Sequence, residues 1–307
     1  MPDSLTLAHI SDLHLPLPRG FQPRHWNVKR GLGYLNWHRG RRSVHTRETV
    51  DRLVADMAVH APGHVAVTGD LVNIGLPVEY EAARAWLEQL GPPEAVSVVP
   101  GNHDIYVRLT RDPGVGRWAP YMAHDAFGRG LGLAAVGGFP FVRRLGPVAV
   151  IGLNSAVPTR PFVAAGRLGT DQIAAARAAL KATREAGLVR VVLIHHPPLR
   201  GMAPRLRGLV DAPELEAVLA AEGADLVLHG HNHRDGIVRI AAVDGARIPV
   251  VGICSGSAAR EHHGEPLGRY NLFTIGREAG RARIQMTARG LSTPGGPIVE
   301  LERVELA

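Results

Sequence analysis

Polar side chains that can bind a metal follow five separate apolar runs of the sequence. In the stretch Val98 to Asp104 an apolar run ends at Pro100-Gly101, and an amide, an imidazole and a carboxylate follow at once. Four other apolar runs lead in the same way to Asp12 and His14, to Asp70, to His195-His196, and to residues 229–233. Short apolar runs bounded by turn residues are typical of buried strands. We therefore expect five strands to deliver Asp, Asn and His to one metal site.

Helices are predicted between these strands. Thr46 can cap a helix that extends to about His60, and a second helix is expected from about Pro77 to Leu90. Strand and helix thus alternate as far as Asn102, which favours parallel pairing of the strands. Later in the chain we expect strands at 148–153, 189–194 and 225–228, and helices at 170–186 and 213–222.

Three segments depart from this alternation. Residues 16–45 are rich in Pro and Gly and are interpreted as an Arg-rich insertion outside the core. Residues 106–147 are expected to form loops and short helices over the site. From about residue 236 only strands are predicted, at 237–243, 248–254, 270–275 and 282–287, and we expect them to form a second, largely antiparallel sheet. Because no linker or repeat is visible, residues 1–307 are interpreted as one domain.

Composition is that of a globular enzyme, with 307 residues and 45% hydrophobic content. The first residues lack a signal-peptide pattern, and no apolar run reaches the roughly 20 residues that span a bilayer, so a cytoplasmic enzyme is expected. Cys254 is the single cysteine, which excludes a thiolate cluster and favours a buried thiol. The net charge of +7 comes almost wholly from arginine and does not by itself indicate nucleic-acid binding.

The polar residues after the strands fit two metal ions better than one. Two aspartates, one asparagine and four histidines exceed the ligands that one ion can use, and Asp70 is the natural bridge. Nitrogen-rich ligation without thiolate suits Mn, Fe, Zn or Co better than Mg. Two ions about 3.5 to 4 Å apart would hold the attacking and leaving oxygens of a displacement at phosphorus. Hydrolysis of a phosphoester is the predicted reaction.

Five motifs resemble the signature of the calcineurin-like metallophosphoesterases, in the order that the family has them. They are Asp12-x-His14, Gly69-Asp70, Gly101-Asn102-His103-Asp104, His195 and Gly230-His231-x-His233. The resemblance covers residues 5–233. It implies an α/β fold, an α+β sandwich, in which two mixed sheets pack face to face between helices and the site lies at one edge.

The resemblance also implies a role for each motif residue. Asp12, His14 and His233 would hold the first metal, Asn102, His195 and His231 the second, and Asp70 would bridge the two. His103 would be the acid or charge stabiliser near the leaving oxygen, with Asp104 orienting its ring. His195 is favoured over His196 as the ligand because the family places the ligand two residues before a proline, here Pro197. His196 and His229 are interpreted as structural.

Departures from relatives narrow the expected substrate. Asn73 stands where purple acid phosphatases have a tyrosinate, and the Ser/Thr phosphatases have an arginine after the second motif and end the third motif in Glu, where this chain has Asp104. Lipid A precursor pyrophosphatases usually carry Arg at the position of His103. A bacterial cyclic nucleotide phosphodiesterase, or a relative acting on small phosphodiesters, fits all five motifs. A phosphomonoesterase, a lipid-linked pyrophosphate hydrolase, a repair nuclease and a metal-binding scaffold without turnover remain as alternatives.

The region from Arg19 to Arg47 contains eight basic residues and four aromatic residues but no acidic residue. One interpretation is plain solvated charge. The other is a flap beside the metals that meets an anionic substrate, an anionic membrane surface or a second subunit, while nucleic acid is less favoured. His262-His263 is interpreted as a surface loop, with a role in the substrate pocket as the alternative.

Overall fold

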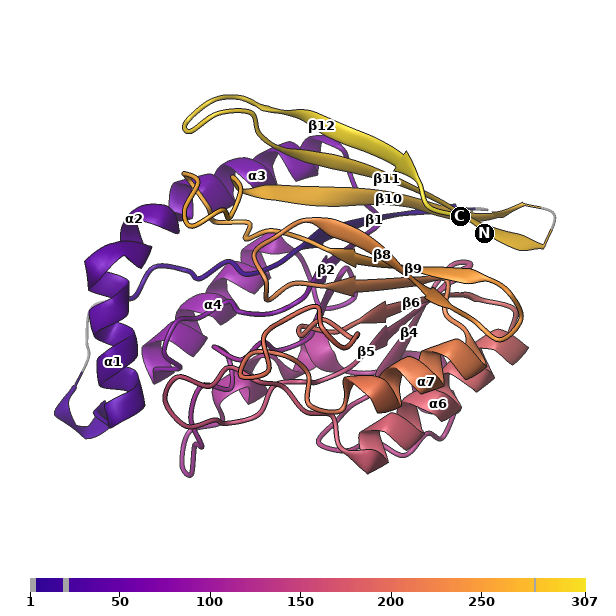
Figure 1. The fold of residues 1–307 in the computed structure, drawn as a ribbon, viewed down its shortest axis with the longest axis horizontal. Coiled ribbons are helices and arrows are strands. Elements are labelled where there is room, and N and C mark those ends of the chain that lie inside the picture. Colours follow the sequence, from indigo (N-terminus) through magenta and orange to yellow (C-terminus); the bar gives the residue numbers. More distant parts are fainter. Residues whose placement is uncertain (1–3, 19–21, 279) are drawn as a thin grey trace.

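Two six-stranded mixed sheets pack face to face in the structure, a computed structural model that describes residues 4–18, 22–278 and 280–307 (Figure 1). The first sheet has the order β12-β11-β10-β1-β2-β3, and the second has the order β4-β5-β6-β7-β9-β8. The strands of the first sheet are β1 (Ser4–Ile10), β2 (His64–Val67), β3 (Val96–Val98), β10 (Arg269–Glu278), β11 (Arg281–Leu291) and β12 (Ile298–Glu305). Those of the second are β4 (Phe141–Leu145), β5 (Val148–Gly152), β6 (Val189–Leu193), β7 (Leu226–His229), β8 (Gly236–Ala241) and β9 (Arg247–Gly252).

Each sheet combines a group of parallel strands with antiparallel strands. In the first sheet β1, β2 and β3 pair in parallel, and in the second β5, β6, β7 and β9 do so. Helices lie in the crossovers between these parallel strands, except that the connection from β7 to β9 runs through β8. The parallel pairing predicted for the strands before Asp12, Asp70 and Asn102 is therefore confirmed. The strands before His195 and His231, β6 and β7, also pair in parallel.

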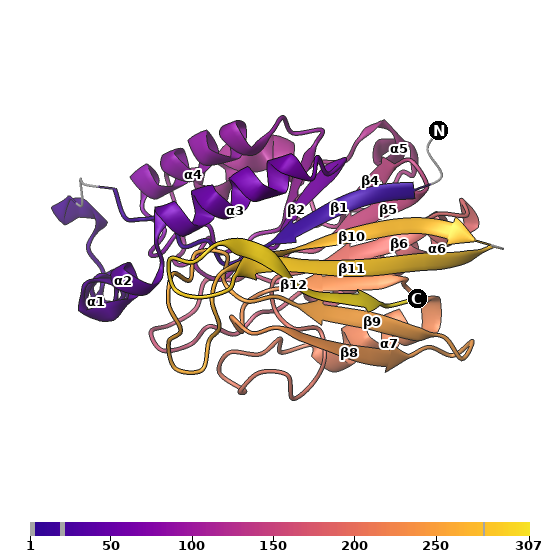
Figure 2. The ribbon, with the colours of Figure 1, turned by 90° about the horizontal axis from the view of Figure 1, so that it is seen from above.

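Helices cover the outer faces of the sandwich. They are α3 (Arg47–Val59), α4 (Pro77–Leu90), α6 (Thr170–Glu185) and α7 (Ala212–Glu222). The first two lie on the side of the first sheet, where α3 contacts β10 and β12, whereas α6 and α7 cover the second sheet (Figures 1 and 2). The Thr46 side chain caps α3 by accepting from the Thr49 N–H, as predicted. No helix in the described part of the chain is long and apolar enough to cross a membrane.

The central strands are buried on both faces, which explains their continuous apolar runs. Val191 and Leu193 of β6 belong to the large core that includes the space between the sheets, while Val192 and Ile194 pack under α6 and α7. Successive side chains of a strand point to opposite faces, so one apolar run contributes to two cores. The stacked layers hold the carboxyl ends of the parallel strands firmly in place.

The outer parts of the fold contain features that the sequence analysis did not predict, and one expectation about them is wrong. The strands after residue 236 form no sheet of their own, because β8 and β9 extend the second sheet while β10, β11 and β12 extend the first. The stretch interpreted as a breaker-rich excursion is largely helical, with a short 3₁₀ turn (Pro23–His25), α1 (Val28–Asn36), a π-helical turn (Trp37–Arg41) and α2 (Arg42–Val44). Residues 106–147 contain a 3₁₀ segment (Gly114–Met122) and α5 (Ala126–Gly130), but also the unpredicted strand β4.

Candidate metal centre

Five loops meet at the carboxyl ends of β1, β2, β3, β6 and β7. The loop after β1 is fastened to the loop after β2, because Asp12 N–H donates to Gly69 O and His14 N–H donates to Asp70 O, both at 2.9 Å. The loop after β7 joins them through His231 N–H, which donates to Asp12 Oδ2 at 3.0 Å. The motif residues thus lie in one hydrogen-bonded network at the edge of the sandwich.

The backbone is strained at these loops. Among the described residues, eight that are not glycine have a positive φ, and five of these eight are expected metal ligands. They are Asp12, His14, Asp70, His231 and His233. Such conformations cost free energy and concentrate at functional sites, where the surrounding structure enforces them. Glycines allow the loops to approach: a Cβ on Gly101 would overlap Asp70, and one on Gly230 would overlap Ser11 and Asp12.

The three residues expected to hold the first metal converge. Asp12, His14 and His233 are buried, and their donor atoms all lie within 4.8 Å of one another. The two Nε2 atoms of His14 and His233 face each other at 3.1 Å, and His233 Nε2 lies 3.3 Å from Asp12 Oδ1. The arrangement is that of a site for one cation.

The residues expected to hold the second metal lie beside the first group. Asn102 Oδ1 lies 2.8 Å from His231 Nδ1 and 3.2 Å from His195 Nε2. Asp70 lies between the two groups, since its Oδ2 is 3.5 Å from His195 Nε2 and 4.0 Å from His14 Nε2. Its position suits a bridging carboxylate.

Three of the histidines are held through the ring nitrogen that points away from the site. Nδ1 of His14 faces Val72 O at 3.4 Å, Nδ1 of His195 faces Thr68 O at 2.6 Å, and Nδ1 of His233 faces Glu265 Oε2 at 2.9 Å. Metal-binding histidines typically donate their other N–H to such acceptors, which fixes the ring and directs Nε2 at the ion.

The donor set fits divalent cations. His231 Nε2 is buried and finds no hydrogen-bond partner among the described residues, and Asp12 Oδ1 faces the His233 ring at 3.3 Å. Although burial opposes it, Asp70 raises the pKa of His195 to about 9, and Asp12 and Glu265 do the same for His233. In the ion-free protein a proton therefore takes the place of a cation between these rings and carboxylates. Metal binding would release those protons.

His103 points into the same site but Asp104 does not orient it, so that expectation is wrong. The Nδ1 of His103 bonds to Asn73 O at 2.5 Å, which leaves Nε2 facing the site. The Asp104 carboxylate is turned the other way and accepts four backbone N–H groups, from Asp70, Leu71, Val72 and Gly101. The position of Asp104 next to His103 in the sequence does not decide which groups its carboxylate binds. Here the backbone N–H groups of two loops bind it.

A cavity of about 370 Å³ opens over these residues. Its walls include residues that the motifs did not reveal, namely Asn36, Arg41, His45, Ala164, Arg207, His262, His263 and Glu265. The pair His262-His263 therefore lines the pocket and is not a remote surface loop. His196 is occupied elsewhere, with its ring nitrogens at Ser155 Oγ and Ala164 O, and His229 Nδ1 bonds to Gly230 O. Among the described residues, the pocket lining includes no residue of 106–147, and this segment reaches the site through Tyr106, whose ring stacks on that of His103.

Arg41 enters the pocket from the helical insertion. Its Nη2 lies 2.9 Å from His14 Nε2, and its Nη1 lies 3.4 Å from His103 Nε2. In the sequence, the many arginines and the lack of acidic residues marked this segment as a candidate for binding an anion. Which of the arginines enters the pocket is decided by the fold, since Arg41 lies at the end of the π-helical turn.

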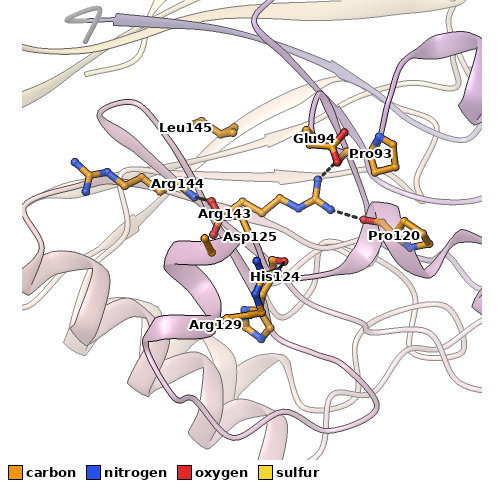
Figure 3. Close-up of a pocket in the computed structure, with 10 residues that line it drawn as sticks. Pro93, Glu94, Pro120, His124, Asp125, Arg129, Arg143, Arg144 and Leu145 are labelled. Carbon is orange, nitrogen blue, oxygen red and sulfur yellow. Dashed lines mark hydrogen bonds between the residues drawn. The ribbon is translucent and has the colours of Figure 1, made fainter.

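A second cavity of similar size shares no lining residue with the pocket at the metal centre. It is lined by Pro93, Pro120, His124, Arg129 and Arg143, among others (Figure 3). Arg143 donates to the backbone carbonyls of Ala123, Pro93, Val96 and Pro120, so its hydrogen-bonding capacity is used in joining loops. We assign it a structural role.

Comparison with known proteins agrees with this geometry. The sequence model of calcineurin-like phosphoesterases matches residues 5–235. A protein of Synechococcus sp. named a probable cyclic nucleotide phosphodiesterase is 27% identical over 234 residues, which cover 75% of this chain and 74% of that protein.

Two solved structures share the fold. The crystal structure of a dimetal phosphatase from Danio rerio superposes with a TM-score of 0.62 at 13% identity, over 100% of both chains. A purple acid phosphatase from yellow lupin gives a TM-score of 0.54 at 13% identity, over 94% of this chain and 52% of the lupin chain. Both likenesses concern the fold alone.

Proposed function

Because the chain belongs to the calcineurin-like phosphoesterase family, we propose that this metal-dependent hydrolase cleaves small phosphodiesters of the cyclic nucleotide type. The observation that carries the proposal is the position of Asp70, whose Oδ2 lies between His14 and His195 and so joins two groups of donors. Preference for a diester is supported by the Synechococcus relative. A cavity of about 370 Å³ also has room for a nucleoside beside the phosphate.

Seven residues would hold the two ions. We assign Asp12, His14 and His233 to one ion, Asn102, His195 and His231 to the other, and Asp70 to both. Two divalent ions bound there would polarise the phosphoryl oxygens and lower the pKa of an attacking water. The loops contribute rigidity, since their backbone hydrogen bonds keep the donors in place before any ion or substrate arrives.

His103 is the proposed proton donor or charge stabiliser for the leaving oxygen. The carbonyl of Asn73 accepts from Nδ1–H, so Nε2 is the atom that can exchange a proton within the pocket. Burial lowers the pKa of His103 to about 4, so the free ring is neutral at pH 7. A bound anionic phosphate beside Nε2 would add to the effect of Asp70 and favour the protonated form that the acid role needs.

Arg41 is the proposed phosphate-binding residue. Its guanidinium lies against Nε2 of both His14 and His103, the two rings that would face the reacting phosphoryl group. A cation bound at this site would occupy the Nε2 lone pair of His14. Arg41 would then be free to donate to a non-bridging phosphate oxygen. Arginine suits this role because its planar fork can donate two parallel hydrogen bonds.

Substrate panels test the proposed class. The Mn²⁺-loaded protein should hydrolyse bis(p-nitrophenyl) phosphate and at least one of 3′,5′-cyclic and 2′,3′-cyclic AMP faster than p-nitrophenyl phosphate. Faster hydrolysis of the monoester would assign the protein to the phosphomonoesterases. No turnover of any phosphoester with two bound ions per chain would favour the binding scaffold.

The Arg41→Gln variant tests the phosphate contact. We expect a rise in KM and a fall in kcat/KM of roughly 10- to 100-fold, the worth of one or two charge-assisted hydrogen bonds. Arg42→Gln is the matched control, because Arg42 is exposed and lines no part of the pocket. Equal kinetics for Arg41→Gln and wild type would remove Arg41 from the substrate site.

A further inference from the structure

Helix α1 turns an apolar face to solvent. Val28, Leu32 and Leu35, spaced by four and three residues, are 73%, 38% and 49% exposed. This spacing places them on one side of the helix. The other side is fixed to the body, since Arg30 is buried and donates to the carbonyls of Ile74 and Gly75. Figure 1 shows α1 at the end of the sandwich. The exposure of Val28, Leu32 and Leu35 shows that this face of the helix is turned to solvent.

Two loops near α1 also expose apolar side chains. Phe162 is 84% exposed in the loop 155–169, and Leu206 and Val210 are 54% and 63% exposed in the loop 195–210. Lys29 of α1 donates to Thr159 Oγ1 at 2.8 Å, and Ala164 N–H donates to Leu206 O at 2.9 Å. The three segments are therefore neighbours. We call the exposed side chains of residues 22–47, 155–169 and 195–210 together the docking face.

The docking face is strongly basic. Its three segments contain twelve of the 35 Lys and Arg residues and none of the 28 acidic ones, which leaves 23 basic and 28 acidic residues for the remainder of the chain. The exposed members include Arg24, Arg39, Arg42, Arg160, Arg200 and Arg205. None of these six forms an ion pair with a carboxylate that the structure describes.

We propose that the docking face binds the surface of an anionic phospholipid bilayer. Exposed aliphatic and aromatic side chains between arginines, on a helix that lies along the surface, are what interfacial binding requires. A symmetric dimer through the same face would bring the two arginine sets together at a cost in free energy. Nucleic acid would use the arginines but would leave Val28, Leu32 and Phe162 without a partner. The face also borders the active-site pocket, since Asn36, Arg41, Ala164 and Arg207 line it, so the pocket opens beside the lipid.

Co-sedimentation with vesicles tests the proposal. Wild type should bind vesicles of phosphatidylcholine with 30% phosphatidylglycerol and not vesicles of phosphatidylcholine alone, and NaCl should weaken the binding. The Val28→Gln/Leu32→Gln/Leu35→Gln variant should lose binding at least tenfold. The Val59→Gln/Val243→Gln variant is the matched control, because these two exposed valines, at 80% and 83%, lie outside the docking face.

The charge contribution is measured with Arg39→Gln/Arg42→Gln. We expect about fivefold weaker binding for each arginine removed at low salt. Hydrolysis of bis(p-nitrophenyl) phosphate in solution should stay unchanged in both variants, which shows that they are folded. Binding that is equal in the α1 variant and its control overturns the proposal. Two other results would also overturn it. One is a wild type that is dimeric in solution and does not bind vesicles, with an α1 variant that is monomeric. The other is a wild type that binds single-stranded DNA more tightly than vesicles.

Discussion

Asp104 Oδ2 accepts a hydrogen bond from the backbone N–H of Asp70 at 2.7 Å. The same oxygen accepts from Gly101 N–H at 2.8 Å, and Oδ1 accepts from Leu71 and Val72. Asp104 therefore ties the loop after β2 to the loop after β3. Its contribution to the site is to place Asp70 and Asn102, since the ring of His103 is held by Asn73.

Removal of this carboxylate should destabilise the fold. In Asp104→Ala four buried N–H groups lose their acceptor, so we expect the free energy of unfolding to fall by at least about 3 kcal/mol, measured by urea denaturation in EDTA. Asp51→Ala is the control, because the exposed Arg47–Asp51 pair is worth only about 0.3 to 0.5 kcal/mol. If Asp104→Ala were as stable as wild type, the hydrogen bonds of Asp104 to the two loops would not stabilise the fold.

His103→Ala should impair turnover without removing metal. Positioned proton transfer typically contributes about 10²- to 10⁴-fold, so kcat should fall by this factor while elemental analysis finds unchanged metal content. An acidic aryl leaving group needs less protonation than an alkyl one and should lose less activity. His38→Ala, at an exposed position, is the control. The same loss for aryl and alkyl esters would speak against proton donation.

Acid should destabilise the protein through His64. Burial lowers the pKa of His64 to about 3, while the unfolded chain takes up this proton near 6.5. Between these values the unfolded state binds more protons, so stability is full above pH 6.5 and falls as the pH drops toward 3. Between pH 7.5 and pH 5 the free energy of unfolding of His64→Gln should fall by about 2 kcal/mol less than that of wild type. Urea unfolding at both pH values measures this difference. If His64→Gln and wild type showed the same pH dependence of the free energy of unfolding, His64 would be protonated at pH 5 in the folded protein. His60→Gln, at an exposed position, serves as control.

The sequence predicted those parts of the fold that depend on local pattern. The strands before Asp12, Asp70, Asn102, His195 and His231 were correctly predicted because a strand buried on both faces leaves a continuous apolar run and ends at turn residues. The strands β4 and β12 left no such pattern, since β12 lies at a sheet edge with mostly exposed, charged residues.

Other features depend on contacts between distant residues. Helix α1 contains Gly31 and Gly33 and reads as a loop, yet a Cβ on Gly33 would overlap Ile74 and Tyr106, so tertiary packing requires the glycine. Glu265 bonds to the ring of His233 from 32 residues away, and no local pattern marks it. Asp104 lies within a recognised motif, but which atoms its carboxylate binds is decided by the fold.

Variants at Asp70 and Asn102 distinguish the bridge from a ligand of one ion. Asp70→Ala should lose both metal occupancy and activity, because its carboxylate lies between the two groups of donors. Asn102→Ala should mainly weaken one site, since its amide oxygen contacts only His195 and His231 among the proposed ligands. Elemental analysis after dialysis measures both. Retention of two ions by Asp70→Ala would exclude a bridging role.

The number of ions bound at full activity tests the dinuclear centre most directly. Metal-free protein is titrated with Mn²⁺ while bound manganese and the hydrolysis of bis(p-nitrophenyl) phosphate are followed together. We expect activity to saturate at two ions per chain, with little turnover at the first. Saturation of activity at one ion per chain would contradict a reaction that depends on both groups of donors.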